Sequence, residues 1–234
     1  MPLQNRVTPF GALVAVTARG GYMGNRGGRI HTDARTLTTR RWASRQWICC
    51  VLDFRGRQRD VWGRFYTELF FLDEVTAFAA GHRPCFECRR RDAERFAAAF
   101  GAADFSAHSR ASGNPDAFSK LGPRFRGDER DGKSHRRISA PEMDAILHRE
   151  RLDGRDKRLH LRVIDALPDG AMIARDGEAF ALRGTRMLRW TPGGYRDEQR
   201  RPRGIDVNVL TPPSIVAALA SGYAPSWHNS GDKS

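Results

Sequence analysis

A pair of cysteines, Cys85 and Cys88, restricts the possible structures of this chain more than any other feature. Two residues separate them, and Pro84 precedes them. This spacing allows both sulfurs to face one ion, and zinc prefers such soft ligands in a tetrahedral set. Pro84 stiffens the approach to the turn because its ring fixes one backbone angle. The pair therefore predicts a zinc site whose remaining ligands come from elsewhere in the chain.

A redox role is the alternative interpretation of this Cys-x-x-Cys pair. Redox pairs usually stand at the start of a helix that directly follows a strand. Here a predicted helix and the sequence Gly81-His82-Arg83-Pro84 come first, so we favour the metal. The neighbouring Arg83, Arg89 and Arg90 favour the thiolate form that metals bind.

The segment from about Phe70 to Arg90 resembles the second half of the Ada-type metal-binding module. That family has a strand ending in aromatic residues, a short helix and then Gly-aromatic-Arg-Pro-Cys-x-x-Cys. Here His82 takes the aromatic position, and the resemblance covers under a tenth of the chain. It implies a zinc module that binds DNA, with Cys85 and Cys88 as the matching ligands. Repair members also transfer a methyl group from DNA to a cysteine, which we do not predict because the family's other cysteine pair is missing.

Upstream, this chain has adjacent Cys49 and Cys50 where the family has two cysteines separated by three residues. Both lie in a predicted strand over residues 47–54, and strand neighbours point to opposite faces. One of them can therefore reach the ion. We favour Cys50, which shares the apolar face of the strand with Ile48. The competing interpretation is that either cysteine is a small buried hydrophobic residue.

The fourth zinc ligand would have to be a histidine or a carboxylate. His31 follows the glycine-rich, basic segment 20–29 and is the first candidate, and His82 is the second. An ordinary core or surface role is the competing interpretation for each histidine. The predicted metal ligands are Cys50, Cys85, Cys88 and His31.

The net charge of +13 is concentrated near the N-terminus, where residues 1–65 hold twelve arginines and three acidic residues, a balance of +9. Tryptophans such as Trp42 and Trp47 interleave with these arginines, a combination that can bind phosphates and stack on bases. Packing of the tryptophans in a small sheet is the alternative. We predict a nucleic-acid-binding surface, with DNA favoured by the Ada-type resemblance. Its predicted residues are Arg26, Arg29, Arg40, Arg41, Arg45, Arg55, Arg57, Arg83, Arg89 and Arg90.

The predicted fold class is α+β, with a small zinc-stabilised N-terminal αβ module followed by a β-rich C-terminal part. Residues 1–101 are expected to form the basic region with the zinc module. Residues 102–137, rich in Gly, Ser, Asp and Arg, are expected to be a linker or loop. Residues 138–234 are expected to form a β-rich domain with a terminal helix.

Turn and cap residues set the expected element boundaries. Strands are predicted over 47–54, 58–62, 66–72, 171–174, 178–182, 186–190 and 205–210, the first two joined as a hairpin by a turn at 55–57. Helices are predicted from the Asp73 cap to Gly81, over 92–100, from the Ser139 capping box to about 152, and from Thr211 with Pro212 at the first position to Gly222.

The leading hypothesis is a zinc-binding and nucleic-acid-binding protein. A metal-dependent nuclease or DNA-modification enzyme and a protein-interaction module with structural zinc are the alternatives. For the enzyme, His148 lies near Asp144 and Glu150 on a short predicted helix, although a solvated helix face has the same spacing. No apolar run approaches the roughly 18 residues of a membrane helix, so we expect a cytoplasmic protein without a membrane partner. No sequence motif indicates a small-molecule substrate.

Overall fold

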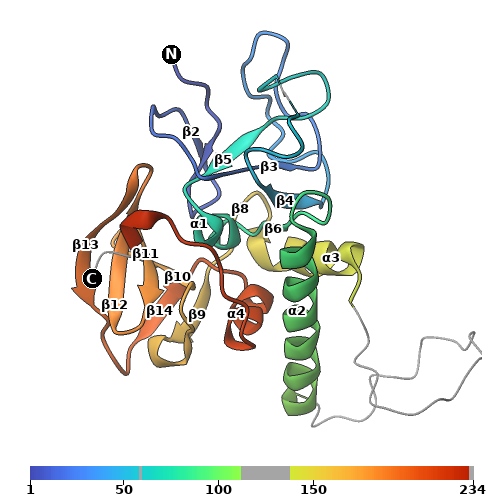
Figure 1. Ribbon diagram of the computed structural model, residues 1–234. Helices are drawn as coiled ribbons and strands as arrows, with labels where there is room; N and C mark the ends of the chain where they lie inside the picture. Colours follow the sequence, from blue (N-terminus) through green and yellow to red (C-terminus); the bar gives the residue numbers. More distant parts are fainter. Residues whose placement is uncertain (58–59, 112–137, 232–234) are drawn as a thin grey trace, which may run out of the picture.

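The computed structural model describes residues 1–57, 60–111 and 138–231. Within these residues the chain forms two six-stranded sheets, a two-stranded hairpin and four α-helices (Figure 1). The predicted α+β class is therefore confirmed. No helix in this described part has the length and apolar character needed to cross a bilayer.

The N-terminal sheet has the strand order β2-β1-β5-β3-β4-β6. Its strands are β1 (Arg6–Val7), β2 (Leu13–Val14), β3 (Tyr22–Arg26), β4 (Trp47–Cys50), β5 (Leu69–Phe71) and β6 (Arg83–Pro84). β4 pairs antiparallel with β3 on one edge and parallel with β6 on the other. Both edges of β4 are thus occupied by segments distant from it in sequence.

The predicted hairpin partner of β4 over 58–62 is wrong for residues 60–62, which form no strand, and residues 58–59 lie outside the described part of the chain. The predicted turn is present, since Arg55 and Gly56 have φ angles of 53° and 65°. The chain after the turn cannot pair with β4, because β3 and β6 already occupy both edges of that strand.

Helix α1 (Glu74–Ala79) lies between the two sheets. It begins as predicted at Asp73, whose Oδ1 accepts a hydrogen bond of 2.8 Å from the backbone N of Thr76. Just beyond its end, Gly81 has a φ of +82°, which is the left-handed region that stops a helix. All six residues of the helix are buried. Ala77 packs with the N-terminal sheet, and Val75 packs with the C-terminal sheet.

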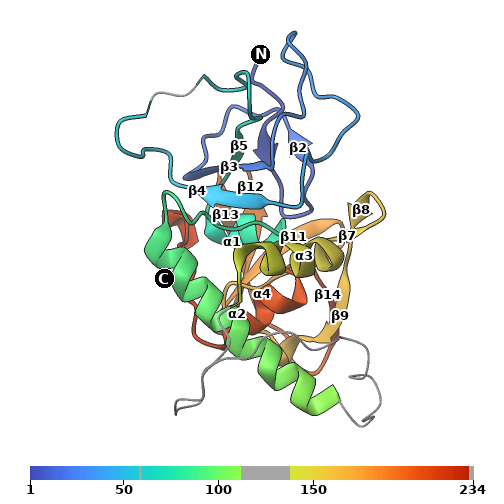
Figure 2. The same ribbon diagram turned by 90° about the vertical axis from the view of Figure 1, so that its right-hand side faces the viewer.

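The other helices, α2 (Arg90–Ala111), α3 (Ala140–Arg151) and α4 (Pro213–Ala220), gather below the N-terminal sheet (Figures 1 and 2). Their buried cluster includes Phe96, Met143, Leu147 and Ile215. The capping box at Ser139 is present as predicted. α4 begins one residue later than predicted, because the Thr211 hydroxyl accepts a hydrogen bond from the Met172 amide and does not cap the helix.

Helix α2 is longer than predicted and corrects the linker assignment. Residues 102–111 continue the helix, and the rest of the predicted linker, 112–137, lies outside the described residues. Gly101 does not end the helix, since a glycine inside a helix costs only about 1 kcal/mol relative to alanine. The alanines that surround it favour continuation.

The C-terminal sheet is antiparallel throughout, with the order β13-β12-β11-β10-β14-β9. Its strands are β9 (His160–Val163), β10 (Met172–Arg175), β11 (Glu178–Arg183), β12 (Arg186–Thr191), β13 (Gly194–Arg200) and β14 (Asp206–Val209). Four were predicted, whereas β9 and β13 were not. The remaining elements are the hairpin of β7 (Leu152–Asp153) and β8 (Asp156–Lys157), and the 3₁₀ turns η2 (Ile164–Ala166) and η3 (Asn229–Gly231).

Residues of the two predicted domains pack together in common buried clusters. Leu72 and Val75 from the N-terminal part belong to the same buried cluster as Met172 and Leu188 of the C-terminal sheet. The Tyr195 hydroxyl also donates a 2.8 Å hydrogen bond to Asp73. The predicted division into 1–101 and 138–234 therefore does not separate two hydrophobic cores.

Candidate metal centre

Three cysteines come together where β4, β6 and the start of α2 meet. The Sγ atoms of Cys50, Cys85 and Cys88 all lie within 4.8 Å of one another. Cys50 ends β4, Cys85 follows β6, and Cys88 stands just before α2. The backbone N of Cys85 donates a 3.0 Å hydrogen bond to the carbonyl of Cys49. The parallel pairing of β4 with β6 thus places Cys85 beside Cys50.

Strand alternation explains why Cys50, and not its neighbour, reaches the Cys85-Cys88 turn. Cys50 pairs with Met23 on β3, and both belong to the cluster that contains Cys85. Cys49 points to the opposite face and packs with Leu69 in a separate cluster. There its Sγ lies 3.6 Å from a guanidinium nitrogen of Arg89. Successive strand residues alternate in this way because the backbone is pleated.

The turn between Cys85 and Cys88 offers backbone donors to sulfur. The amide of Glu87 donates to the Sγ of Cys85 at 3.4 Å, and the amide of Arg89 donates to the Cys85 carbonyl at 3.0 Å. Hydrogen bonds from the Cys50 and Cys88 thiols lower the pKa of Cys85, and the bond to Cys85 raises the pKa of Cys50. Like charges repel, so three thiols this close disfavour more than one thiolate, whereas a bound cation would favour the thiolate form of all three. The cluster could therefore hold a metal ion.

Neither histidine considered as a fourth ligand belongs to this group. The Nδ1 of His31 lies 2.6 Å from the Thr67 hydroxyl, and its ring stacks on Trp62 at 5.1 Å. The Thr67 oxygen accepts from the Ile30 amide, so its hydrogen is free to donate to His31. The prediction that His31 joins the cysteines is thus corrected: Thr67 and Trp62 hold its ring elsewhere.

The His82 side chain is buried among aromatic rings of the core. Its ring is fully buried, 5.0 Å from the Trp47 ring and 4.7 Å from the Phe71 ring. Neither of its ring nitrogens has a hydrogen-bond partner among the described residues. The side chain therefore packs as an aromatic ring in the core.

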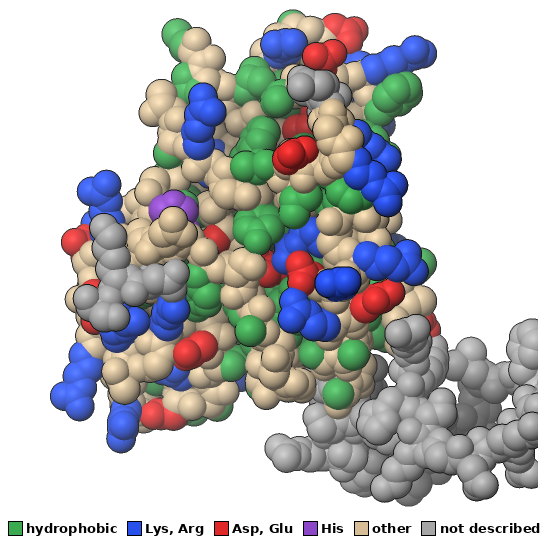
Figure 3. All heavy atoms as spheres, in the orientation of Figure 1, with side chains coloured by type: hydrophobic (Ala, Val, Ile, Leu, Met, Phe, Trp, Pro, Cys, Tyr) green, Lys and Arg blue, Asp and Glu red, His purple; other side chains and the backbone are tan. Residues whose placement is uncertain are grey.

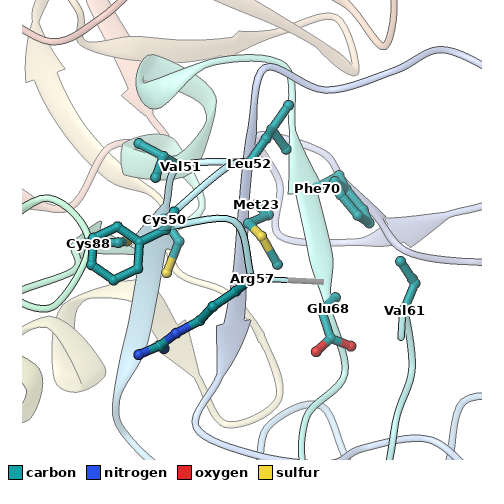
Figure 4. A pocket seen from close by; sticks show the side chains of 10 residues that line it. Met23, Cys50, Val51, Leu52, Arg57, Val61, Glu68, Phe70 and Cys88 are labelled. Carbon is teal, nitrogen blue, oxygen red and sulfur yellow. The ribbon is translucent and has the colours of Figure 1, made fainter. Parts of the chain in front are cut away.

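The cysteines lie in the wall of a cleft of about 530 Å³. Residues that line it include Asn25, Arg57, Arg64, Phe65, Tyr66 and Glu68. A smaller adjoining pocket of about 260 Å³ also reaches Cys50 and Cys88 (Figure 4). The ion would thus border a space large enough for a small ligand.

Asn25 and Glu68 were not predicted as site residues, although both are buried polar residues in the cleft wall. Asn25 lies on β3, and Glu68 immediately precedes β5. Glu68 directly precedes the apolar run Leu69-Phe70-Phe71, which was the available signal for it, whereas no local pattern marks Asn25. A charged residue next to a buried strand needs a partner or a ligand.

Three of the arginines predicted to bind nucleic acid are buried. Arg83 forms two hydrogen bonds to Asp144, at 2.8 and 2.7 Å. Arg89 forms a 2.7 Å ion pair with Glu74, and Arg26 lies over the Trp47 ring at 4.1 Å. The predictions for Arg26, Arg83 and Arg89 are wrong, because side chains enclosed by these partners cannot reach a phosphate.

Asp144 and His148 do not form the hydrolytic site considered from the sequence. Asp144 is occupied by Arg83, as described above, and His148 packs edge-on against Trp42 with ring centroids 5.4 Å apart. Glu150 accepts hydrogen bonds from Ser214 at the start of α4. These side chains of α3 connect elements of the fold.

The other predicted arginines lie at the surface or are half-buried. Figure 3 shows Lys and Arg side chains scattered over one face among acidic and hydrophobic ones, with no continuous basic patch on that face. Exposed members are Arg40, Arg45, Arg55, Arg57 and Arg90, and half-buried members are Arg29 and Arg41. Arg57 also lines the cleft beside the cysteines and pairs with Glu87 at 2.7 Å.

No known protein family, curated protein or solved structure matches this chain.

Proposed function

We propose that this protein binds a zinc ion through Cys50, Cys85 and Cys88 and that it binds nucleic acid, with DNA as the expected partner. The observation that carries the zinc proposal is the approach of three Sγ atoms to within 4.8 Å of one another. A tetrahedral ion with Zn–S bonds of about 2.3 Å places its sulfurs about 3.8 Å apart. Small side-chain adjustments would bring the three sulfurs to that spacing.

The ion would connect three separate segments of the N-terminal region. Cys50 belongs to β4, Cys85 to the end of β6, and Cys88 to the approach to α2. Among the described residues the group has three members, so water or a bound molecule would fill the fourth position. Catalytic zinc sites keep such an open position. This feature favours a metal-dependent enzyme acting on nucleic acid as the second candidate function.

Nucleic-acid binding is supported by the positive charge and by the composition of the cleft. The chain carries a net charge of +13, and Arg57 and Arg64 line the cleft together with the exposed rings of Phe65 and Tyr66. Guanidinium groups bind phosphates, and aromatic rings stack on bases. The Ada-type resemblance adds DNA as the preferred partner.

Metal analysis of the full-length protein, purified without chelator, tests the zinc proposal. We expect about one equivalent of zinc, as for a single tetrahedral site. Cys85→Ala should abolish it, whereas Cys49→Ala, the matched control on the opposite face of β4, should retain it. Less than about a tenth of an equivalent in the unmodified protein would contradict the proposal.

Titration of duplex and single-stranded DNA at two salt concentrations tests the partner. Binding should weaken steeply as salt rises, because arginine–phosphate contacts release counterions. Undetectable binding at low salt would favour a protein-interaction module with structural zinc. Incubation with plasmid or methylated DNA and a divalent metal would test the enzyme, and cleaved or modified DNA would establish it.

A further inference from the structure

Two buried polar side chains line the metal cleft, one on β3 and one just before β5. The antiparallel ladder of β3 and β5 ends at the pair Gly24 and Leu69, and Asn25 and Glu68 are the next residues of the two segments. They are only 6% and 5% exposed. Both line the cleft that contains the cysteines.

Each of these side chains has one polar atom bound and one free. The amide of Gly27 donates to the Oδ1 of Asn25 at 2.9 Å, and the amide of Trp62 donates to the Oε2 of Glu68 at 2.8 Å. Within the described residues, the Nδ2 of Asn25 and the Oε1 of Glu68 have no hydrogen-bond partner. Neither atom is among the fully enclosed unpartnered atoms of the described residues, so both are open to the cleft. The wall of the cleft therefore presents a donor from Asn25 and an acceptor from Glu68.

The mouth of the cleft adds aromatic and cationic groups. The side chains of Phe65 and Tyr66 are 69% and 45% exposed, although both are large aromatic residues. The guanidinium carbon of Arg64 lies 5.4 Å from the Phe65 ring centroid. Such a combination stacks on a planar ring and attracts a phosphate attached to it.

We propose that this cleft binds an unpaired nucleobase beside the metal ion, an inference that rests on the proposed nucleic-acid function. The Watson–Crick edge of a base offers a donor next to an acceptor, which matches the Glu68 carboxylate and the Asn25 amide. In a duplex that edge is occupied by the partner strand, so only a single-stranded or extruded nucleotide can present it. The source of the base is a nucleic-acid strand or a free nucleotide.

The test uses the zinc-loaded full-length protein and three labelled DNAs at one salt concentration. They are a single strand of about 12 nucleotides, its duplex, and a strand of equal length with abasic sites, which keeps the phosphates and lacks the bases. The intact strand should bind at least about tenfold more tightly than either of the others. Competition with mononucleotides then separates the two sources: a nucleotide that competes as well as the strand identifies a free-nucleotide site, and competition by strands alone identifies a strand-binding site.

Two variants test whether the DNA binds in the cleft. Tyr66→Ala should weaken the intact strand about 5- to 100-fold and leave the abasic strand unchanged, as expected for loss of one stacking ring. Glu68→Gln keeps an acceptor for Trp62 and replaces a free acceptor with a donor, so it should change the ranking of the four homopolymer strands. Leu161→Ala, an exposed change on β9, is the matched control and should change neither. Zinc content and melting temperature establish that each variant is folded.

Equal affinity for intact and abasic strands would overturn the nucleobase site, as would Tyr66→Ala and Glu68→Gln variants that bind like the unmodified protein. Salt-dependent binding would still support the proposed function. Failure to bind any of the DNAs or mononucleotides would overturn both proposals.

Discussion

The guanidinium group of Arg151 stacks on the ring of Trp47, with its central carbon 3.8 Å from the ring centroid. Arg26 contacts the same ring at 4.1 Å. Burial lowers the pKa of both arginines to about 9. Arg151 also donates to the carbonyls of Gly81 and Arg45, so it joins α3 to the N-terminal sheet.

Replacement of Trp47 tests how much its ring stabilises these cations. A desolvated cation–π contact contributes about 2 kcal/mol, and Trp47 makes two. Trp47→Leu should therefore lower the free energy of unfolding by about 2–4 kcal/mol more than Trp47→Phe, which retains an aromatic face. Urea unfolding gives both values. Trp42→Leu, at a half-buried position, is the control and should have a smaller effect; equal losses for Trp47→Leu and Trp47→Phe would contradict the cation–π account.

The free energy of unfolding should depend strongly on whether both partners of the buried Arg83–Asp144 ion pair are present. Both side chains are almost fully enclosed, and removal of one leaves a buried charge. Asp144→Leu should destabilise the protein by about 3–5 kcal/mol, whereas the double variant Arg83→Met, Asp144→Leu should be much less affected. A double-mutant cycle in urea gives the coupling. Losses that simply add would show that the pair contributes no specific interaction.

Local signals predicted the elements that depend on local chemistry. The Asp73 cap and the Ser139 capping box set helix starts, because a side-chain oxygen there accepts a nearby amide hydrogen bond. The period of two in β4 separated Cys49 from Cys50, since pleating sends neighbouring side chains to opposite faces. In each prediction the deciding interaction lies within a few residues.

Interactions between distant segments could not be predicted. His31 meets Thr67, and Arg89 meets Glu74, only because the sheet and helices bring them together. Arginine is usually exposed, so its burial follows from partners that the sequence does not reveal. β13 was missed because the stretch Arg196-Asp197-Glu198-Gln199-Arg200 lacks alternating apolar residues, and pairing with β12 makes it a strand.

Tyr195 tests whether the N-terminal and C-terminal parts are energetically coupled. Its hydroxyl donates to the buried Asp73 carboxylate, which also accepts from the backbone N of His228 at 3.1 Å. Tyr195→Phe should cost about 1–3 kcal/mol, because Asp73 would lose a partner without gaining water. Tyr66→Phe, on an exposed side chain, should cost almost nothing. Thermal unfolding followed by both near- and far-UV circular dichroism should show one shared transition, and two separate transitions would contradict the shared core.

The buried His82 should make the stability of the protein fall as the pH is lowered. Burial, followed by the charges of Arg26 and Arg151, lowers the pKa of its imidazole well below the ordinary 6.5. The unfolded chain therefore takes up this proton first as the pH falls. The stabilisation present above pH 6.5 is lost progressively below it, because the unfolded state then binds more protons than the folded one.

Replacement of His82 with phenylalanine should remove this dependence. His82→Phe keeps an aromatic ring against Trp47 and Phe71 and eliminates two buried nitrogens that lack partners among the described residues. We expect a gain of about 1–3 kcal/mol at pH 7 and a weaker loss of stability between about pH 6.5 and 5. His160→Gln, at a half-buried position, controls for titration outside the core. Parallel stability–pH curves for the unmodified protein and His82→Phe, measured by urea unfolding across this range, would contradict the prediction.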